Sequence, residues 1–222
     1  MSNGVAVTGM GVVSPVGIGV PAMWSGIVAG ESGVTPVASI DVSDLPSRIA
    51  GQVLDFDGDA ALGSRTTRRT DRYVQMALVA AREALADSGL APDEALSPQI
   101  GCFMGSGIGG IATLSTQYDV LAERGPRRVS PFLVPMMIVN MAAGQVAIDL
   151  GLKGPNMAMV SACASGAHAI GEAAATIQRG DAVAMLAGGC EAPISRIGMT
   201  GFTQGRAMST GFNDNPAAAS RP

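Results

Sequence analysis

The chain has 222 residues, of which 47% are apolar and 14% charged, and it contains 30 glycines but only one Trp and two Tyr. This composition excludes a disordered protein and indicates a sizeable core built largely from small side chains. The net charge of −4 argues against electrostatic binding of nucleic acid, and no uninterrupted apolar run reaches the length of a membrane span.

The first third of the chain predicts a strand, a helix, a long connection and a second helix. The strand covers residues 5–9 and is expected to be buried. The first helix covers 21–29, with Pro in its first turn. Residues 31–64 carry turn residues and predict an excursion over the surface. Helical periodicity then runs over 67–87 and ends at Ser88-Gly89.

The rest of the chain alternates short apolar strands with helices, which predicts α/β layers around a mainly parallel sheet. No strand or helix is predicted after Gly188. The predicted strands cover 100–104, 157–161 and 181–187, and the predicted helices cover 111–123, 136–150 and 164–179.

Cys163 stands where a predicted buried strand gives way to a helix of small residues. A thiol at the first turn of a helix faces unpaired backbone N–H groups, which favour the thiolate. The position is therefore suited to covalent catalysis. Cysteine is also among the most buried residue types and often packs as a small hydrophobe, so both interpretations stay open here.

His168 is the single histidine and therefore the one candidate among the histidines for a base that activates Cys163. Five helical residues place it roughly 140° around the helix axis from the cysteine. We therefore expect a structural histidine rather than a Cys–His dyad. A mechanism that needs two histidines cannot run on these residues alone.

The segment Gly105–Gly110 matches G-x-G-x-x-G between a strand and a helix, the formal dinucleotide fingerprint. The acidic residue expected at the end of the next strand is missing, because Asp119 and Glu123 fall within a predicted helix. We interpret the segment as a tight turn beside a substrate pocket.

Seven of the 14 basic residues are arginines that fall in two short windows, 65–72 and 124–128. Arginine suits bidentate binding of carboxylate or phosphate, so the windows are candidates for docking an acidic partner. Solvated helix faces are the alternative. The three cysteines lack disulfide or metal-ligand spacing and no signal peptide is visible, which predicts a cytoplasmic protein.

Several segments together resemble the N-terminal half of a β-ketoacyl-acyl carrier protein synthase, closest to the type II elongating enzymes. The resemblance extends over essentially the whole chain and is most specific around Cys163. The segments are residues 5–17, 130–135, 154–166, 187–191 and 213–222.

The resemblance implies a thiolase-like layered α/β/α fold made of two halves, with residues 1–222 as the N-terminal domain. The chain is expected to be truncated before the last strand of that domain and before the C-terminal half. Cys163 would take an acyl chain as a thioester, which a malonyl-derived carbanion attacks in fatty acid elongation. Two histidines and a lysine would come from the second half, and no cofactor or metal is implied.

The resemblance also assigns supporting roles. An acidic acyl carrier protein is the implied partner, and helix 136–149 matches a dimer contact, which implies a homodimer. A polyketide-type ketosynthase and a non-catalytic dimerising remnant are the alternatives, and we expect the 222-residue chain alone to be inactive. The acyl-pocket positions are Ile108, Pro193, Gly198 and Phe202, and the carrier-binding positions are Arg65, Arg68, Arg69, Arg127, Arg128 and Arg206.

Overall fold

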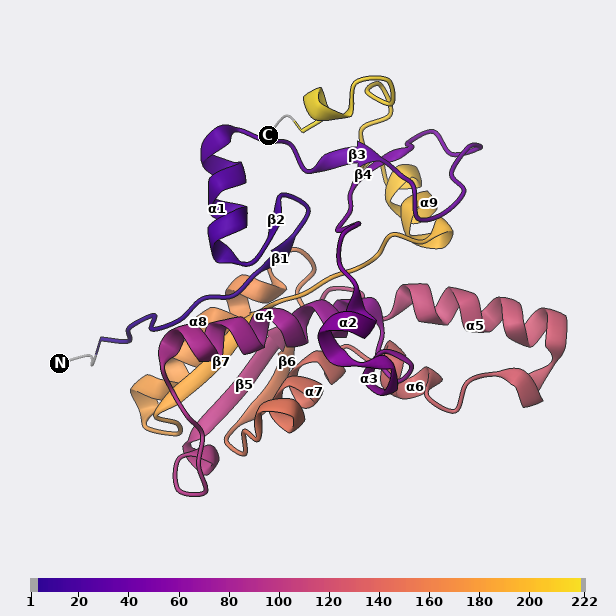
Figure 1. The fold of residues 1–222 in the computed structure, drawn as a ribbon. Coiled ribbons are helices and arrows are strands. Elements are labelled where there is room, and N and C mark those ends of the chain that lie inside the picture. Colours follow the sequence, from indigo (N-terminus) through magenta and orange to yellow (C-terminus); the bar gives the residue numbers. More distant parts are fainter. Residues whose placement is uncertain (1–3, 221–222) are drawn as a thin grey trace.

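A three-stranded parallel sheet forms the centre of the computed structural model, which describes residues 4–220 (Figure 1). Its order is β6 (Asn156–Met159), β5 (Ile100–Gly105), β7 (Ala184–Gly189). Every residue of β5 is buried, as expected of an apolar strand with neighbours on both sides and layers on both faces. In register, Cys102 lies opposite Asn156 on one side and Leu186 on the other.

Helices cover both faces of this sheet, so the predicted α/β/α layering is confirmed (Figure 1). On one face, α4 (Arg72–Ser88) and α7 (Met141–Leu150) pack against Cys102 and Met104. On the other, α8 (Ser165–Arg179) packs against Phe103. Successive side chains of β5 therefore point to opposite layers, as the pleat of a strand requires.

Helix α4 begins later than its periodicity predicts because Asp71 interrupts it. The Asp71 side chain caps the helix by accepting a hydrogen bond from the Tyr73 N–H, at 3.3 Å. Its other oxygen accepts from the Thr113 N–H at 3.2 Å. Thr113 belongs to α5 (Ile111–Arg124), so one buried carboxylate fixes the start of both helices. A short helix, α3 (Ser64–Thr67), precedes the cap.

The single helix predicted over 136–150 is wrong, because the segment forms two helices. α6 (Leu133–Met137) ends before α7 begins, and Ile138 between them is extended. The carbonyl of Met137 accepts from the Gly110 N–H at 3.0 Å, and that of Ile138 accepts from the Tyr73 hydroxyl at 2.7 Å. Tertiary partners thus take carbonyls that a continuous helix would use.

The strand predicted over residues 5–9 is also wrong. The segment is irregular and Val7 is 81% exposed. It continues along α4, whose carboxylates accept hydrogen bonds from the Met10 and Val12 N–H groups, each at 2.9 Å. The Met10 and Val12 N–H groups, which follow the segment, are thus paired with side chains of α4 rather than with a neighbouring strand.

The region predicted as a surface excursion holds more structure than expected. β3 (Val34–Pro36) and β4 (Ile49–Gly51) form an antiparallel pair, and α2 (Gly58–Leu62) follows. The β3–β4 pair lies to one side of the central sheet, near the first hairpin and helix, whereas α2 lies against α4 (Figure 1). That hairpin pairs β1 (Val13–Ser14) with β2 (Gly17–Ile18), and it leads into α1 (Val20–Ala29), which agrees with the helix predicted there.

An unpredicted helix, α9 (Arg196–Gln204), follows β7. Ser195 caps it by accepting from the Gly198 N–H at 3.2 Å, and the Arg196 guanidinium pairs with Asp44 at 2.7 Å. Met199 is buried against Val42 and Leu45. These long-range contacts outweigh the low helix propensity of its glycines. Within the described residues, three 3₁₀ turns complete the secondary structure, Ser97–Gln99, Pro126–Arg128 and Pro216–Ala218.

Candidate active site

Cys163 lies in the turn that joins β6 to α8, and its side chain is exposed. Ala164 is the N-cap of α8, so the helix begins at Ser165, two residues after Cys163. The sequence predicts that it begins one residue earlier, at Ala164. Ala162 has φ of 53°, in the left-handed region that a residue with a side chain rarely occupies. Such a turn stores backbone strain, which is typical of functional sites, and it holds the thiol toward solvent.

Ser165 fixes the shape of this turn, a role that the sequence analysis missed. Its buried hydroxyl donates to the Ala162 carbonyl at 2.7 Å and accepts from the Ser161 N–H at 2.8 Å. The Ser165 N–H also donates to the Ala162 carbonyl, at 3.1 Å. Serine in a first helical turn commonly bonds nearby backbone in this way, so the residue type was the available signal.

His168 is bonded to Ser161 rather than to the thiol. The Ser161 Oγ and His168 Nδ1 atoms are 2.6 Å apart, and the histidine is exposed. Within residues 4–220, no hydrogen bond joins His168 to Cys163. The geometry therefore gives this histidine a place in the scaffold of the turn, beside the nucleophile but not paired with it.

The Gly105–Gly110 turn lies directly against the Cys163 turn. A Cβ atom at Gly107 would lie 3.2 Å from the Ala162 Cα, and one at Gly105 would lie 2.3 Å from the Ser165 backbone. Close approach of two backbones explains why glycine stands at both positions. The structure thus brings Ile108, which is half-buried, into the neighbourhood of the thiol.

The backbone N–H groups of this turn are used within the protein. Ser106 donates to the Met159 carbonyl, Gly107 and Ile108 to the Glu191 carboxylate, Gly109 to the Ser106 hydroxyl, and Gly110 to the Met137 carbonyl. A dinucleotide site needs such groups free to bind phosphate. The hydrogen bonding argues against a nucleotide site, and the place of this turn beside a substrate pocket stays a prediction.

The other three pocket positions lie after β7. Pro193 is in the connection to α9, and Gly198 and Phe202 are on that helix. Gly198 packs so closely that a Cβ atom there would lie 2.2 Å from the Pro193 carbonyl oxygen. Phe202 is 42% exposed. The structure therefore brings Pro193 and Gly198 together, and the pocket role of these residues stays a prediction.

The six predicted carrier-binding arginines are all exposed, and within the described part of the chain none forms an ion pair. The Arg69 guanidinium lies over the Phe132 ring, 4.9 Å from its centre, which ties the end of α3 to the segment before α6. Arg127 and Arg128 lie in the 3₁₀ turn after α5. Arg206 follows α9.

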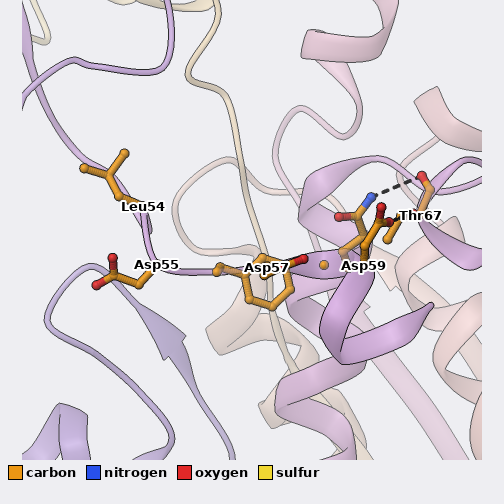
Figure 2. Close-up of a pocket in the computed structure, with 8 residues that line it drawn as sticks. Leu54, Asp55, Asp57, Asp59 and Thr67 are labelled. Atoms are coloured by element: carbon orange, nitrogen blue, oxygen red, sulfur yellow. Dashed lines mark hydrogen bonds between the residues drawn. The ribbon is translucent and has the colours of Figure 1, made fainter. Parts of the chain in front are cut away.

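Figure 2 shows an open hollow of about 410 Å³ elsewhere in the molecule, lined by residues 54–59 with Thr67 and Gln75. Two of its three acidic side chains have structural partners. Asp57 caps α2 by accepting from the Ala60 N–H at 3.0 Å, and Asp59 accepts from the Thr67 hydroxyl. The hollow contains none of the predicted site residues.

The two remaining cysteines differ from Cys163 in environment. Burial raises the pKa of Cys102, in the centre of β5, to about 12. Burial, together with the neighbouring Glu191 carboxylate, raises the pKa of Cys190 to about 12. Both are therefore neutral thiols at physiological pH, and Cys163 is the most exposed of the three thiols.

A family model described as "Beta-ketoacyl synthase, N-terminal domain" matches residues 2–222, and the chain belongs to this family. It is 48% identical over 218 residues to a 3-oxoacyl-(acyl-carrier-protein) synthase 2 of Coxiella burnetii. A protein of the same name from Staphylococcus aureus is 46% identical. Each match covers 98% of this chain and 52% of the relative, so the chain spans about half the length of these relatives.

Solved structures show the same fold. A β-ketoacyl synthase from Burkholderia phymatum STM815 superimposes with a TM-score of 0.84 at 31% identity, over 97% of this chain and 53% of that one. A second neighbour is the ishigamide ketosynthase/chain length factor, with a TM-score of 0.82 at 26% identity over 89% of this chain and 49% of that one.

A third neighbour is a type II polyketide ketosynthase in complex with its acyl-carrier protein. It has a TM-score of 0.76 at 25% identity, and the match covers 91% of this chain and 55% of that one.

Residues 4–220 contain neither a candidate membrane span nor a candidate metal site. No helix in that part of the chain is both long and apolar enough to cross a bilayer. No group of three or more His, Cys, Asp or Glu side chains there is arranged to hold a metal ion.

Proposed function

We propose that this chain carries the nucleophile of a 3-oxoacyl-acyl carrier protein synthase, an acyltransferase of fatty acid elongation. The observation that carries the proposal is the exposed Cys163 thiol on a strained turn, against the turn that bears Ile108. Membership of the β-ketoacyl synthase family supports the same chemistry.

The first step forms one thioester and breaks another. The Cys163 sulfur attacks the carbonyl carbon of an acyl-carrier thioester, the carrier sulfur leaves, and it takes up the proton that the thiol gave away. In the condensing step, malonyl-carrier protein loses CO₂ and its carbanion attacks the acyl-Cys163 carbonyl. The cysteine sulfur leaves, and the product is a 3-oxoacyl chain two carbons longer on the carrier.

Groups beyond those of this chain are needed for the condensing step. The resemblance to elongating synthases supports two histidines and a lysine in the second half, together with an N–H that joins that of Cys163 in an oxyanion hole. The one histidine here is bonded to Ser161. The 222-residue chain alone is therefore proposed to be inactive in condensation.

Acidic acyl carrier protein is the proposed partner of the six arginines. Their exposure and lack of internal ion pairs leave their guanidinium groups available for carboxylates or phosphate. The ketosynthase that was solved with its acyl-carrier protein supports this partner class.

A homodimer in the cytoplasm is the proposed form of the protein. Among the described strands, β6 has a free edge, and Met157 on it is 47% exposed. Ile148 on α7 is 74% exposed. A free strand edge with apolar neighbours suits pairing with a second copy. The three free cysteines fit a reducing compartment.

Acyl loading tests the central proposal. Wild-type protein incubated with acyl-carrier protein is expected to gain the mass of one acyl group on the peptide that contains Cys163, as measured by mass spectrometry. Cys163→Ala should abolish the gain, whereas the matched control Cys190→Ala should retain it. Undiminished loading of Cys163→Ala contradicts the proposal.

A polyketide-type ketosynthase is the second candidate, favoured by the likeness to the ishigamide ketosynthase/chain length factor and to the carrier-bound polyketide enzyme. The two candidates differ in the acyl groups that they load. Saturated alkyl chains on Cys163 support fatty acid elongation, and a preference for 3-oxoacyl chains supports the polyketide reaction.

A further inference from the structure

Glu191 joins the ends of two neighbouring strands near the candidate nucleophile. It follows β7, and its carboxylate accepts three hydrogen bonds from the turn that follows β5. One oxygen accepts from the Ser106 hydroxyl at 3.0 Å, and the other accepts from the Gly107 and Ile108 N–H groups at 2.7 and 3.1 Å. Hydrogen bonds to a carboxylate are stronger than neutral ones, so this contact holds the turn firmly.

The rest of the turn depends on the same contact. Ser106 is 2% exposed, and its hydroxyl, held by Glu191, accepts from the Gly109 N–H at 3.0 Å. Gly109 has φ of 68°, and a Cβ atom there would lie 2.6 Å from the Met137 carbonyl oxygen. One carboxylate thus organises a tight turn.

This turn is in contact with the residue that precedes the nucleophile. Gly107 lies close enough to Ala162 that a Cβ atom would approach its Cα to 3.2 Å and the Glu191 Oε2 atom to the same distance. Ala162 is the residue with left-handed backbone. Any shift of the turn therefore changes both the position of Ile108 and the wall beside Cys163.

We propose that Glu191 is a positioning residue that fixes the Ser106–Gly109 turn and thereby limits the space for an alkyl chain beside Cys163. The part of the proposal that concerns acyl selectivity rests on the proposed function. The part that concerns the space beside the Cys163 thiol can be measured directly.

Glu191→Gln removes the negative charge of this side chain with little change in its size. The glutamine carbonyl oxygen keeps two acceptor sites, but its NH₂ group only donates. The variant therefore loses the negative charge and the acceptor of the Ser106 hydroxyl. We expect the turn to become more mobile, so that Ile108 can move aside and longer alkyl chains fit beside Cys163.

The test uses N-alkylmaleimides of increasing chain length on the 222-residue chain, with the rate of Cys163 modification read by peptide mass spectrometry. In Glu191→Gln, the rate with the longest reagent relative to the shortest should rise about threefold or more, the factor that a weakened hydrogen bond produces. Glu94→Gln, an exposed control that lies before β5, whereas the turn follows β5, should leave this ratio at the wild-type value.

A second variant approaches the turn from its other side. Gly107→Ala keeps Glu191 but forces the turn away from Ala162, and it should change the same ratio. An unchanged ratio in Glu191→Gln overturns the proposal whatever Gly107→Ala does. So does an equal change with every reagent, because that reports only a general loosening of the Cys163 turn.

Loading from acyl-carrier protein is measured separately, on a protein that also supplies the groups of the second half. Absence of loading on Cys163 there refutes the proposed function, while the maleimide series still decides the role of Glu191. Loading with an unchanged chain-length ratio in Glu191→Gln supports the function and refutes the inference.

Discussion

Three features of individual residues shape the candidate site at Cys163: its exposure, the left-handed backbone of Ala162 and the buried hydroxyl of Ser165. The sequence leaves open whether Cys163 is a nucleophile or a packing residue, because a strand–helix junction is compatible with both. The exposed side chain of Cys163 does not pack in the core, and its role as nucleophile stays a prediction. Cys102 shows the contrasting case, with its thiol in the core.

Ser165 provides a prediction at this scale. Ser165→Ala removes two hydrogen bonds and leaves the Ser161 N–H without its partner, which should cost about 1–3 kcal/mol of unfolding free energy. The loss also frees Ala162 from its strained conformation, so Cys163 should be alkylated more slowly. Chemical denaturation and alkylation rates measure the two effects.

Ser25→Ala, an exposed position on α1, is the control and should change neither quantity. A Ser165→Ala protein with wild-type stability and alkylation rate would show that the turn keeps its shape without the hydroxyl.

Secondary structure elements were predictable where their own residues decide them. The strand predicted over 100–104 and the helix predicted over 111–123 agree with β5 and α5, because apolar run length and terminal glycines mark them locally. The predictions failed where distant partners decide. The 136–150 segment is broken by hydrogen bonds from Tyr73 and Gly110, and α9 depends on Asp44.

The exposed arginines of α3 and of the 3₁₀ turn after α5 carry a prediction at the scale of elements. The quadruple variant Arg65→Ala, Arg68→Ala, Arg127→Ala and Arg128→Ala should bind acyl carrier protein more weakly, by roughly tenfold at low salt, since each exposed ion pair contributes little. The difference should shrink at high salt, because salt screens exposed charges. Fluorescence anisotropy with labelled carrier protein measures both.

Lys153→Ala is the matched control, an exposed cation in the loop before β6. If its affinity falls as far as that of the quadruple variant, binding depends on total charge and the assignment of the arginines is wrong.

Many large apolar side chains are exposed on the surface of the molecule. α5 projects away from the sheet, and Leu114, Tyr118 and Leu121 on one of its faces are 44%, 68% and 44% exposed (Figure 1). Val7, Val28 and Ile148 are 81%, 69% and 74% exposed. An exposed apolar face such as that of α5 is typical of an interaction surface.

We therefore predict that the 222-residue chain associates in solution. Sedimentation velocity should show a concentration-dependent increase in mass, and Met157→Asp, on the free edge of β6, should reduce it through charge repulsion between paired copies. A monodisperse, cooperatively melting monomer at all concentrations would contradict the prediction. An equal effect of Val28→Asp on α1 would show that the apolar surface acts generally rather than through the strand edge.

The sequence by itself determined the family, the layered fold and the candidate nucleophile, because short motifs and the periodicity of apolar residues are local properties. Only the tertiary structure decided how the Cys163 turn is held. Glu191 and Gly107 act through contacts between the ends of separate strands, and Glu191 is 84 residues from Gly107 in the chain. Such contacts arise when the parallel strands assemble side by side, and no local pattern of residues encodes them.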